Sequence, residues 1–183
     1  MTSILTPGPR RRVRIDVGDV FLIPISSARV AVGQVVWRRR PSKTDYLMVI
    51  YDGLYPADPI PDIDAALRRP IRLQGVTFDP LLRMGRWRVV ARRPVPVDHM
   101  RWPLFKVMIE PPDRYAVTDH TGAVLRRATG AESDALPLHT SSGPIVLEEA
   151  ARALAGLATW SPYFDVLLPA GDERRPLGRL DPE

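Results

Sequence analysis

The stretch 18-GDVFLIPISSARVAVGQVVW-37 decides the fold, because it places two apolar runs on either side of a short polar segment. Side chains of residues 19–25 and 30–37 alternate between two faces, and apolar residues occupy both, which indicates β-strands partly covered on each side. Residues 26–29, SSAR, form the predicted turn. Gly33 inside the second run predicts a bulge or a sharp bend, as barrels need at their corners. The stretch therefore predicts an antiparallel hairpin.

Short strand-like segments continue along the chain, between turns rich in proline and glycine. The chain contains 20 prolines, which argues against long helices. Residues 46–51, YLMVIY, are the most apolar run and predict a central strand. Further strands are predicted at residues 71–78, 86–95, 103–109, 114–119 and 123–127. We expect an α+β, β-rich fold: a curved, partly closed antiparallel sheet with an SH3-like, barrel-type start.

Two helices are expected to pack on this sheet. A short one is capped by Asp62 or Asp64 and ends before Pro70. A longer C-terminal helix begins at residues 143–144, with the two serines before it as expected caps. Its apolar stripe comprises Leu147, Ala150, Ala151, Leu154, Leu157 and Ala158. Glu148 and Arg152 are expected to form an i,i+4 ion pair on the opposite side.

Composition limits the classes of protein to which the chain can belong. No cysteine is present, which excludes disulfides, thiolate metal ligands and cysteine nucleophiles. No apolar run reaches the roughly 18 residues of a membrane span, and the N-terminus lacks the apolar segment of a secretory signal. We therefore expect a cytoplasmic protein without a membrane partner. One β-rich domain is expected over residues 13–168, with a flexible lead at 1–12 and a flexible tail at 169–183.

The charge is distributed unevenly along the chain. The formal net charge is +5, and nearly all basic residues are arginine. Basic residues outnumber acidic ones by nine in residues 1–93, whereas acidic residues lead by four in residues 94–183. A basic first half can steer a charged partner, or the two halves can attract each other within one fold.

No arrangement of residues in the sequence resembles a catalytic or metal site. The histidines, His99, His120 and His139, lie too far apart to form a local metal pair. Asp119 next to His120 offers an acid–base pair, but both lie in a predicted turn, where such residues usually serve the backbone. Neither a nucleophile elbow nor a phosphate-binding glycine loop is present in the sequence. We expect no cofactor and no metal, and we interpret the chain as a non-enzyme.

Two segments interleave tryptophan with arginine: WRRR at residues 37–40 and RWRVVARR at residues 86–93. This mixture binds phosphates and stacks on bases, so a nucleic-acid-binding SH3-like barrel module is one interpretation. In the other interpretation Trp37 and Trp87 fill core or half-buried strand positions, and the arginines form a solvated loop or protect a sheet edge.

The opening hairpin resembles the N-terminal signature of immunity protein family 26 from bacterial polymorphic toxin systems. The similarity is carried by Gly18, Asp19, Phe21, Ile23, Pro24, Gly33, Gln34 and Val35. Residues 81–96, LLRMGRWRVVARRPVP, resemble the family's Gly-x-Trp-x-Val-Ile-Gly segment through Gly85, Trp87, Val89 and Val90. Residues 102–107, WPLFKV, resemble the Pro-x-Phe step after it. Ala91 stands where a glycine is common in the family, so the local turn differs there.

The resemblance implies a protein that binds a cognate toxin, encoded next to it, and neutralises it by steric occlusion. Because this chain is basic, we expect a toxin with an acidic face, or contact through the acidic C-terminal half. Aromatic and arginine side chains are the commonest interface anchors, so the partner-binding candidates are Trp37, Arg38, Arg39, Arg40, Tyr51, Leu54 and Tyr55. The residues expected to build the scaffold are Gly18, Asp19, Phe21, Pro24, Gly33, Gly85 and Trp87. Nucleic acid is the alternative partner.

Overall fold

A computed structural model describes residues 14–42 and 44–178. The predicted lead at residues 1–12 and the end of the predicted tail lie outside the described residues. The strands are β1 (Asp19–Pro24), β2 (Arg29–Arg38), β3 (Asp45–Tyr51), β4 (Tyr55–Pro56), β5 (Ile71–Phe78), β6 (Arg88–Arg92), β7 (Phe105–Glu110), β8 (Arg114–Thr118) and β9 (Val124–Arg127). The α-helices are α1 (Ile63–Leu67), α2 (Pro80–Arg83), α3 (Gly130–Ala135) and α4 (Pro144–Leu154), and η1 (Val97–His99) and η2 (Pro162–Leu167) are 3-10 helices.

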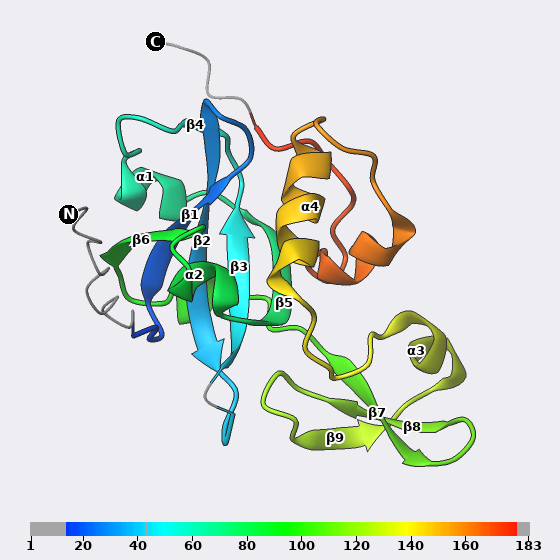
Figure 1. The fold of residues 1–183 in the computed structure, drawn as a ribbon. Helices are drawn as coiled ribbons and strands as arrows, with labels where there is room; N and C mark the ends of the chain where they lie inside the picture. The colour runs from blue at the N-terminus through cyan, green and yellow to red at the C-terminus, as the bar shows by residue number, and fades with distance from the viewer. Residues whose placement is uncertain (1–13, 43, 179–183) are drawn as a thin grey trace, which may run out of the picture.

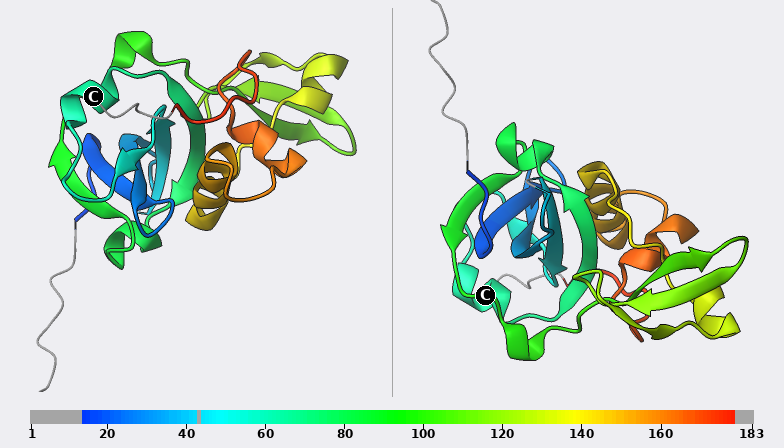
Figure 2. Two further views of the ribbon diagram at one scale, coloured as in Figure 1. Left: turned by 90° about the horizontal axis from the view of Figure 1, so that it is seen from above. Right: turned by 90° about the horizontal axis from the view of Figure 1, so that it is seen from below.

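Two antiparallel sheets form the fold. The main sheet has the order β5-β3-β2-β1-β6, with β4 paired to the start of β2, and the second sheet has the order β7-β8-β9. Figure 1 shows the second sheet and α3 beside the main sheet, while α4 and η2 lie against β5. Seen from above and below, the strands of the main sheet curve around one another (Figure 2). The α+β, β-rich class is confirmed.

The arrangement of the strands differs from one continuous, partly closed sheet. The main sheet is open, with β5 and β6 at its edges, and the last three predicted strands form the second sheet. Prolines 94, 96 and 103 lie in the connection between β6 and β7. Proline lacks the N–H that a sheet ladder requires, so the chain leaves the main sheet at this point.

Both faces of the main sheet are buried, which explains why apolar residues occupy both sides of the strands. One face carries Phe21, Val35, Met48 and Leu73 and is covered by α4 and by residues of the C-terminal segment. The other face is covered by α1, by the connection after β6 and by the first residue of β7. Asp62 caps α1 as predicted, since its Oδ1 accepts a hydrogen bond of 3.0 Å from the backbone N–H of Ala65. The double cover is typical of a sheet at the centre of a domain.

Gly33 does not form a bulge, which was one of the two features predicted for it. It pairs in regular register with Phe21 on β1 and with Ile50 on β3, and the irregularity in β2 falls between Val35 and Trp37. The glycine is required instead by a close approach: a Cβ atom at this position would lie 2.5 Å from Cε2 of Phe21. That ring is stacked on Trp87, with ring centroids 5.2 Å apart and planes inclined by 2°. The absence of a side chain at Gly33 therefore makes room for the aromatic pair.

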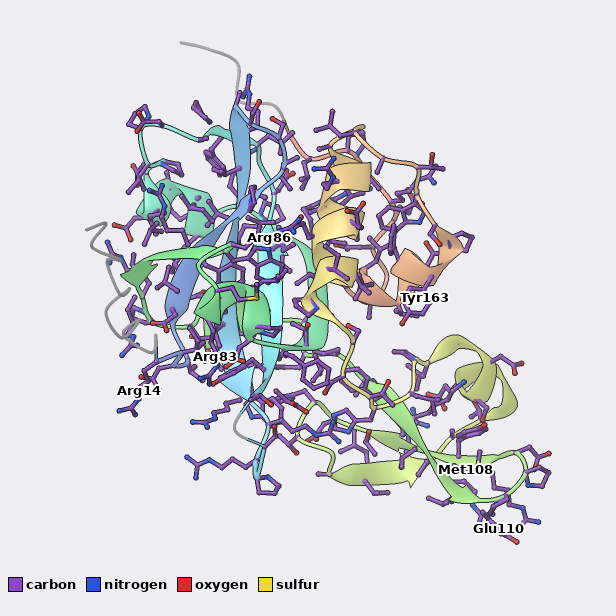
Figure 3. The ribbon with its side chains drawn as sticks, viewed as in Figure 1. Arg14, Arg83, Arg86, Met108, Glu110 and Tyr163 are labelled. Carbon is purple, nitrogen blue, oxygen red and sulfur yellow. The ribbon has the colours of Figure 1, made fainter. Side chains whose placement is uncertain are left out.

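A buried carboxylate connects this aromatic pair to the C-terminal helix. The indole N–H of Trp87 donates a hydrogen bond of 2.9 Å to Oε2 of Glu148, whose side chain is only 1% exposed. Arg86 forms an ion pair with the same carboxylate, and Figure 3 shows Arg86 lying near α4. The predicted Glu148–Arg152 pair is therefore wrong. Arg152 instead donates to the backbone carbonyl of Ile25 at 2.9 Å. Glu148 faces the sheet because the hydrogen bond satisfies a buried indole N–H.

The ends of α4 also differ from the sequence-based expectation. The helix ends at Leu154, so Leu157 lies beyond it and is 52% exposed. Its N-cap is Gly143, which makes no side-chain capping bond. The serines expected as caps bind the sheet instead: Ser141 Oγ donates to Asp45 Oδ2 at 2.8 Å, and Ser142 Oγ donates to the carbonyl of Val76 at 3.4 Å. The serines therefore fasten the chain before α4 to β3 and β5.

Three further features were not predicted from the sequence. The linker before β6 contains α2, and α3 is closed by a capping box between Thr129 and Glu132. Part of the predicted tail packs on the fold: Leu177 is buried, and its N–H donates to the carbonyl of Leu154 at 3.1 Å. Among the described residues, no helix is long and apolar enough to cross a membrane.

Substitution Gly33→Ala is expected to lower the free energy of unfolding by about 1–3 kcal/mol, because the added methyl group overpacks the ring of Phe21. Gly130→Ala is the matched control, since a Cβ at that position meets no atom within 4 Å. The measurement is urea denaturation followed by tryptophan fluorescence. Equal stability of the two variants would contradict the close-approach explanation.

Substitution Glu148→Ala is expected to lower the free energy of unfolding by about 1–3 kcal/mol, because it leaves the buried indole N–H of Trp87 without an acceptor. Glu149→Ala, one residue along the same helix and partly exposed, should change stability by no more than about 0.5 kcal/mol. Both values come from the same denaturation experiment. A Glu148→Ala variant as stable as the control would show that the carboxylate does not stabilise the packing of α4 on the sheet.

Candidate partner-binding surface

The hairpin between β2 and β3 carries three consecutive arginines to one end of the main sheet. Arg38 is the last residue of β2, and its guanidinium lies 5.7 Å from the ring centroid of Tyr46. The backbone N–H of Arg39 donates to the carbonyl of Asp45 at 2.9 Å, so the ladder extends one residue beyond β2. Arg40 is exposed. The structure therefore brings these three predicted partner-binding residues together at a basic tip.

Trp37 lies at the base of this tip and is half-buried. The irregularity in β2 between Val35 and Trp37 shifts the register, and Trp37 packs on the face of the sheet that α1 covers. Its ring meets that of His120 edge-on, with centroids 5.3 Å apart, and His120 stacks on Trp102 at 4.1 Å. Because His120 lies in the turn between β8 and β9, these rings join the main sheet to the second sheet.

A second histidine packs in the same region. His139 stacks on Phe105, with ring centroids 4.7 Å apart. Burial lowers the pKa of His120 and also that of His139, which Arg39 lowers further. Nδ1 of His120 and Nε2 of His139 are buried and have no hydrogen-bond partner within residues 14–42 and 44–178. Both imidazoles are therefore best accommodated in the neutral form.

Asp119 serves the turn rather than an acid–base pair. Its Oδ1 accepts hydrogen bonds from the backbone N–H of Thr121 at 2.8 Å and of Ala123 at 3.0 Å, and from the Thr121 hydroxyl at 2.6 Å. The Thr121 hydroxyl is the main cause of the lowered pKa of Asp119. His120 instead stacks on Trp102 and meets the ring of Trp37 edge-on. The geometry therefore supports the turn interpretation of residues 119–122.

The second sheet exposes apolar side chains next to the basic tip. Val124 and Leu125 of the edge strand β9 are 62% and 54% exposed. Val124 pairs with Thr118, two residues before His120, so it lies close to the cluster around Trp37. The apolar side chains Val107, Met108 and Ile109 on β7 are also exposed, and Figure 3 places Met108 near the outer end of this sheet. The second sheet therefore leaves apolar side chains exposed on both of its outer strands, and exposed apolar side chains can mark a binding site.

We call the set of Arg39, Arg40, Trp37, Val124 and Leu125 the β2–β9 surface, whose two parts are linked by the contact of Trp37 with His120 in the turn before β9. The sequence identified its arginines and Trp37 but not its β9 half. The available signal was the pair of adjacent apolar residues in the short segment AVLRR, which does not alternate as a half-buried strand should. Nor did the sequence indicate that His120 would meet Trp37, because that contact joins residues 83 positions apart between different sheets.

The other predicted partner-binding residues lie inside the fold. Tyr51, Leu54 and Tyr55 are buried. The hydroxyl of Tyr51 donates to Oε1 of Gln34 at 2.7 Å, and burial raises the pKa of this tyrosine. Gln34 in turn donates to the carbonyl of Arg93 at 3.0 Å, so the pair connects β2, β3 and the end of β6. These residues offer almost no surface to a partner.

The residues expected to build the scaffold lie at turns and in the core. Gly18 has φ of +94°, and a Cβ there would lie 2.8 Å from the carbonyl oxygen of Arg93. Asp19 accepts hydrogen bonds from the N–H of Asp16 at 2.9 Å and from Arg92 at 2.8 Å. The remaining members are Phe21 and Pro24 on β1, Gly33 on β2, Gly85 in the turn after α2, and Trp87 before β6. None of them belongs to the β2–β9 surface.

Within the described part of the chain, no group of three or more His, Asp or Glu side chains could hold a metal ion. The β2–β9 surface consists of basic, aromatic and aliphatic side chains. Such a composition can bind a macromolecular surface, and it presents no nucleophile next to a base.

Comparison with known proteins gives one match. Residues 16–112 match the family model described as Immunity protein 26. The matched region begins before β1 and ends in the turn after β7, so it includes the main sheet, Trp87 and one strand of the second sheet. No curated protein and no solved structure matches the chain.

The two buried histidines predict how stability depends on pH. Their pKa values in the folded protein lie below the value of about 6.5 that an unfolded chain has, so the unfolded state binds more protons as the pH falls. The free energy of unfolding should therefore be highest above pH 6.5 and should decrease towards pH 5.5. The pKa of Glu132 is about 2, far from this range.

The measurement is urea denaturation at pH 7.5 and at pH 5.5 for the natural chain and for a His120→Gln, His139→Gln variant. The loss of stability at the lower pH should be smaller in the variant. His99 is present in both proteins, so it does not affect the comparison. An unchanged pH dependence in the variant would show that these imidazoles are not the groups that titrate.

Proposed function

This chain belongs to the Immunity protein 26 family, and we propose that it neutralises a cognate bacterial protein toxin by binding it and covering its active site. The family name gives the class, an immunity protein of a toxin system, and points to a non-enzymatic role. We propose that the toxin belongs to a polymorphic toxin system, is encoded next to this chain and is met in the cytoplasm.

The observation that carries the proposal is the β2–β9 surface. It combines exposed Arg40 and half-buried Arg39 at the tip with Val124 and Leu125, which are 62% and 54% exposed. The rings of Trp37, His120 and Trp102 fasten its two halves together beneath. A preorganised surface loses little conformational entropy when it binds, which favours a tight complex.

Charge identifies the kind of toxin face that fits this surface. Arg39 and Arg40 give the surface a positive potential, so a partner with an acidic face would be attracted from a distance and oriented on approach. Val124 and Leu125 would then bury apolar area against the toxin. This arrangement supports the expectation of an acidic toxin face, and the part of the C-terminal half that it uses, β9, contributes apolar rather than acidic side chains.

Steric occlusion of an active site requires no catalytic group in this chain, only a contact area of sufficient size. A standard protein–protein interface buries about 800 Å² on each partner, enough to cover an active-site cleft. The tip and β9 lie on two different sheets, and a footprint that spans both can approach this area.

The nucleic-acid interpretation has less support. Base stacking needs an aromatic face that is open to solvent, but Trp37 is half-buried and packs against His120, and Trp87 is fully buried on Phe21. The arginine tip could still attract phosphates. Binding to nucleic acid is therefore an outcome that the experiment below must distinguish.

The expected result is a stable complex with the product of the neighbouring toxin gene, weakened at least about tenfold by Leu125→Asp, a loss of about 1.4 kcal/mol. The matched control is Leu157→Asp, because Leu157 is similarly exposed but lies after α4. Arg40→Glu should slow association more than Arg29→Glu, which makes the same charge change at the other end of β2. Surface plasmon resonance gives both rates.

Two results would contradict the proposal. One is equal binding by Leu125→Asp and Leu157→Asp, which would place the interface elsewhere. The other is a chain that does not bind the toxin but co-purifies with nucleic acid and releases it at high salt.

A further inference from the structure

A polar pocket of about 350 Å³ lies at the other end of the main sheet. It is bounded by the start of β5, by Arg101 and by the C-terminal segment, and its lining includes Pro70, Ile71, Arg72, Gln74, Pro169 and Arg175. Arg38, at the end of β2, pairs with Tyr46 on β3, and Tyr46 pairs with Thr77 near the end of β5. This pocket instead borders residues 70–74, at the start of β5. The pocket is therefore separate from the β2–β9 surface.

Arg72 is a buried cation that has no carboxylate partner among the described residues. Its side chain belongs to a residue that is only 8% exposed, and Nη2 donates to the backbone carbonyl of Arg175 at 2.7 Å. In the part of the chain that the structure describes, Nε of Arg72 is buried and has no hydrogen-bond partner. Arg72 forms no ion pair with the described residues, and the nearby Asp172 pairs with Arg101. A buried charge costs free energy unless an opposite charge accompanies it.

The neighbouring charges do not supply that opposite charge. Asp172 lines the pocket, but its Oδ1 accepts a hydrogen bond from Arg101 at 2.8 Å. Glu173 also lines the pocket and is exposed to solvent, as is Arg175. Among the described residues, three guanidinium groups and two carboxylates line the pocket, so its lining carries one excess positive charge. Such a balance suits a ligand with a single negative charge better than a dianion.

We propose that this pocket binds a small organic acid through its carboxylate. The guanidinium groups of Arg72 and Arg175 would attract the carboxylate, since planar guanidinium groups match its geometry. The amide of Gln74, which is 4% exposed, adds a polar group to the same wall. Pro70, Ile71 and Pro169 provide apolar surface for the rest of a small molecule, and the volume lies within the range of ligand pockets. This site does not depend on the proposed toxin binding.

The test is thermal unfolding of the purified full chain with sodium acetate, propionate or benzoate, against sodium chloride at the same ionic strength and pH. Ligands that bind only the folded state raise the melting temperature in proportion to their occupancy. We expect the carboxylates to raise it above the chloride value. Inorganic phosphate at the same ionic strength should have a smaller effect.

Three variants locate the binding. Arg175→Ala should weaken binding at least about fivefold, because it removes a guanidinium from the pocket, a loss of about 1 kcal/mol. Arg174→Ala is the matched control, since its guanidinium lies over the ring of Trp160 at 6.0 Å and lines a different pocket. Glu173→Gln should strengthen binding, because it removes a competing carboxylate.

A direct readout accompanies the melting curves. In ¹H–¹⁵N spectra, the Nε–H signal of Arg72 should move on titration with propionate, and it should not move with chloride. The proposal is overturned if no carboxylate stabilises the chain beyond chloride. Equal carboxylate binding by Arg175→Ala and Arg174→Ala would overturn it as well, as would tighter binding of phosphate.

Discussion

The stack of Trp87 on Phe21 above Gly33, with the indole N–H bound to Glu148, is the contact on which the rest of the structure depends. It joins β1, β2 and the start of β6 through aromatic surface, and it reaches α4 through one hydrogen bond. Each partner needs the others: the ring of Phe21 occupies the space that a side chain at Gly33 would fill, and the buried indole needs an acceptor. Three of these four residues lie within the region that matches the family, whereas Glu148 lies beyond it. The helix is thus attached to the family's sheet by a residue outside the family match.

The sequence predicts well what is local. Alternating apolar residues identified the strands, and Asp62 identified the start of α1, because periodicity and capping act within a few residues. What it could not supply is pairing over long distances. Nothing in Val124 or Leu125 shows that β9 belongs to a separate sheet, and the same segment could have extended the first one. Glu148 looked like a solvent-facing partner of Arg152 because helical spacing alone cannot show which polar residue meets a buried donor on another element. The serines before α4 were misassigned as caps for the same reason.

The fold places two different kinds of surface at opposite ends of the main sheet. At the end of β2, arginines and aliphatic side chains lie near the packed rings of Trp37, His120 and Trp102, and this kind of surface suits a protein partner. At the start of β5, the buried guanidinium of Arg72 borders a small pocket, which suits a small anion. The long interior strands separate them, so a change at one end need not disturb the other. The uneven charge of the chain also has a structural explanation in part: several arginines of the first half are used internally, as in the pairing of Arg92 with Asp19 and of Arg86 with Glu148. Arg40 at the hairpin tip is exposed, so a partner can reach it.

The central claim is that this chain protects a cell from its cognate toxin, and the most direct test is growth. The toxin encoded beside this chain is produced from an inducible promoter in cells that also produce either this chain or its Leu125→Asp variant, with equal protein levels verified by immunoblot. The account predicts that the natural chain restores growth and that the variant protects only partly or not at all. Cells that stop growing despite a soluble, folded and abundant natural chain would contradict it.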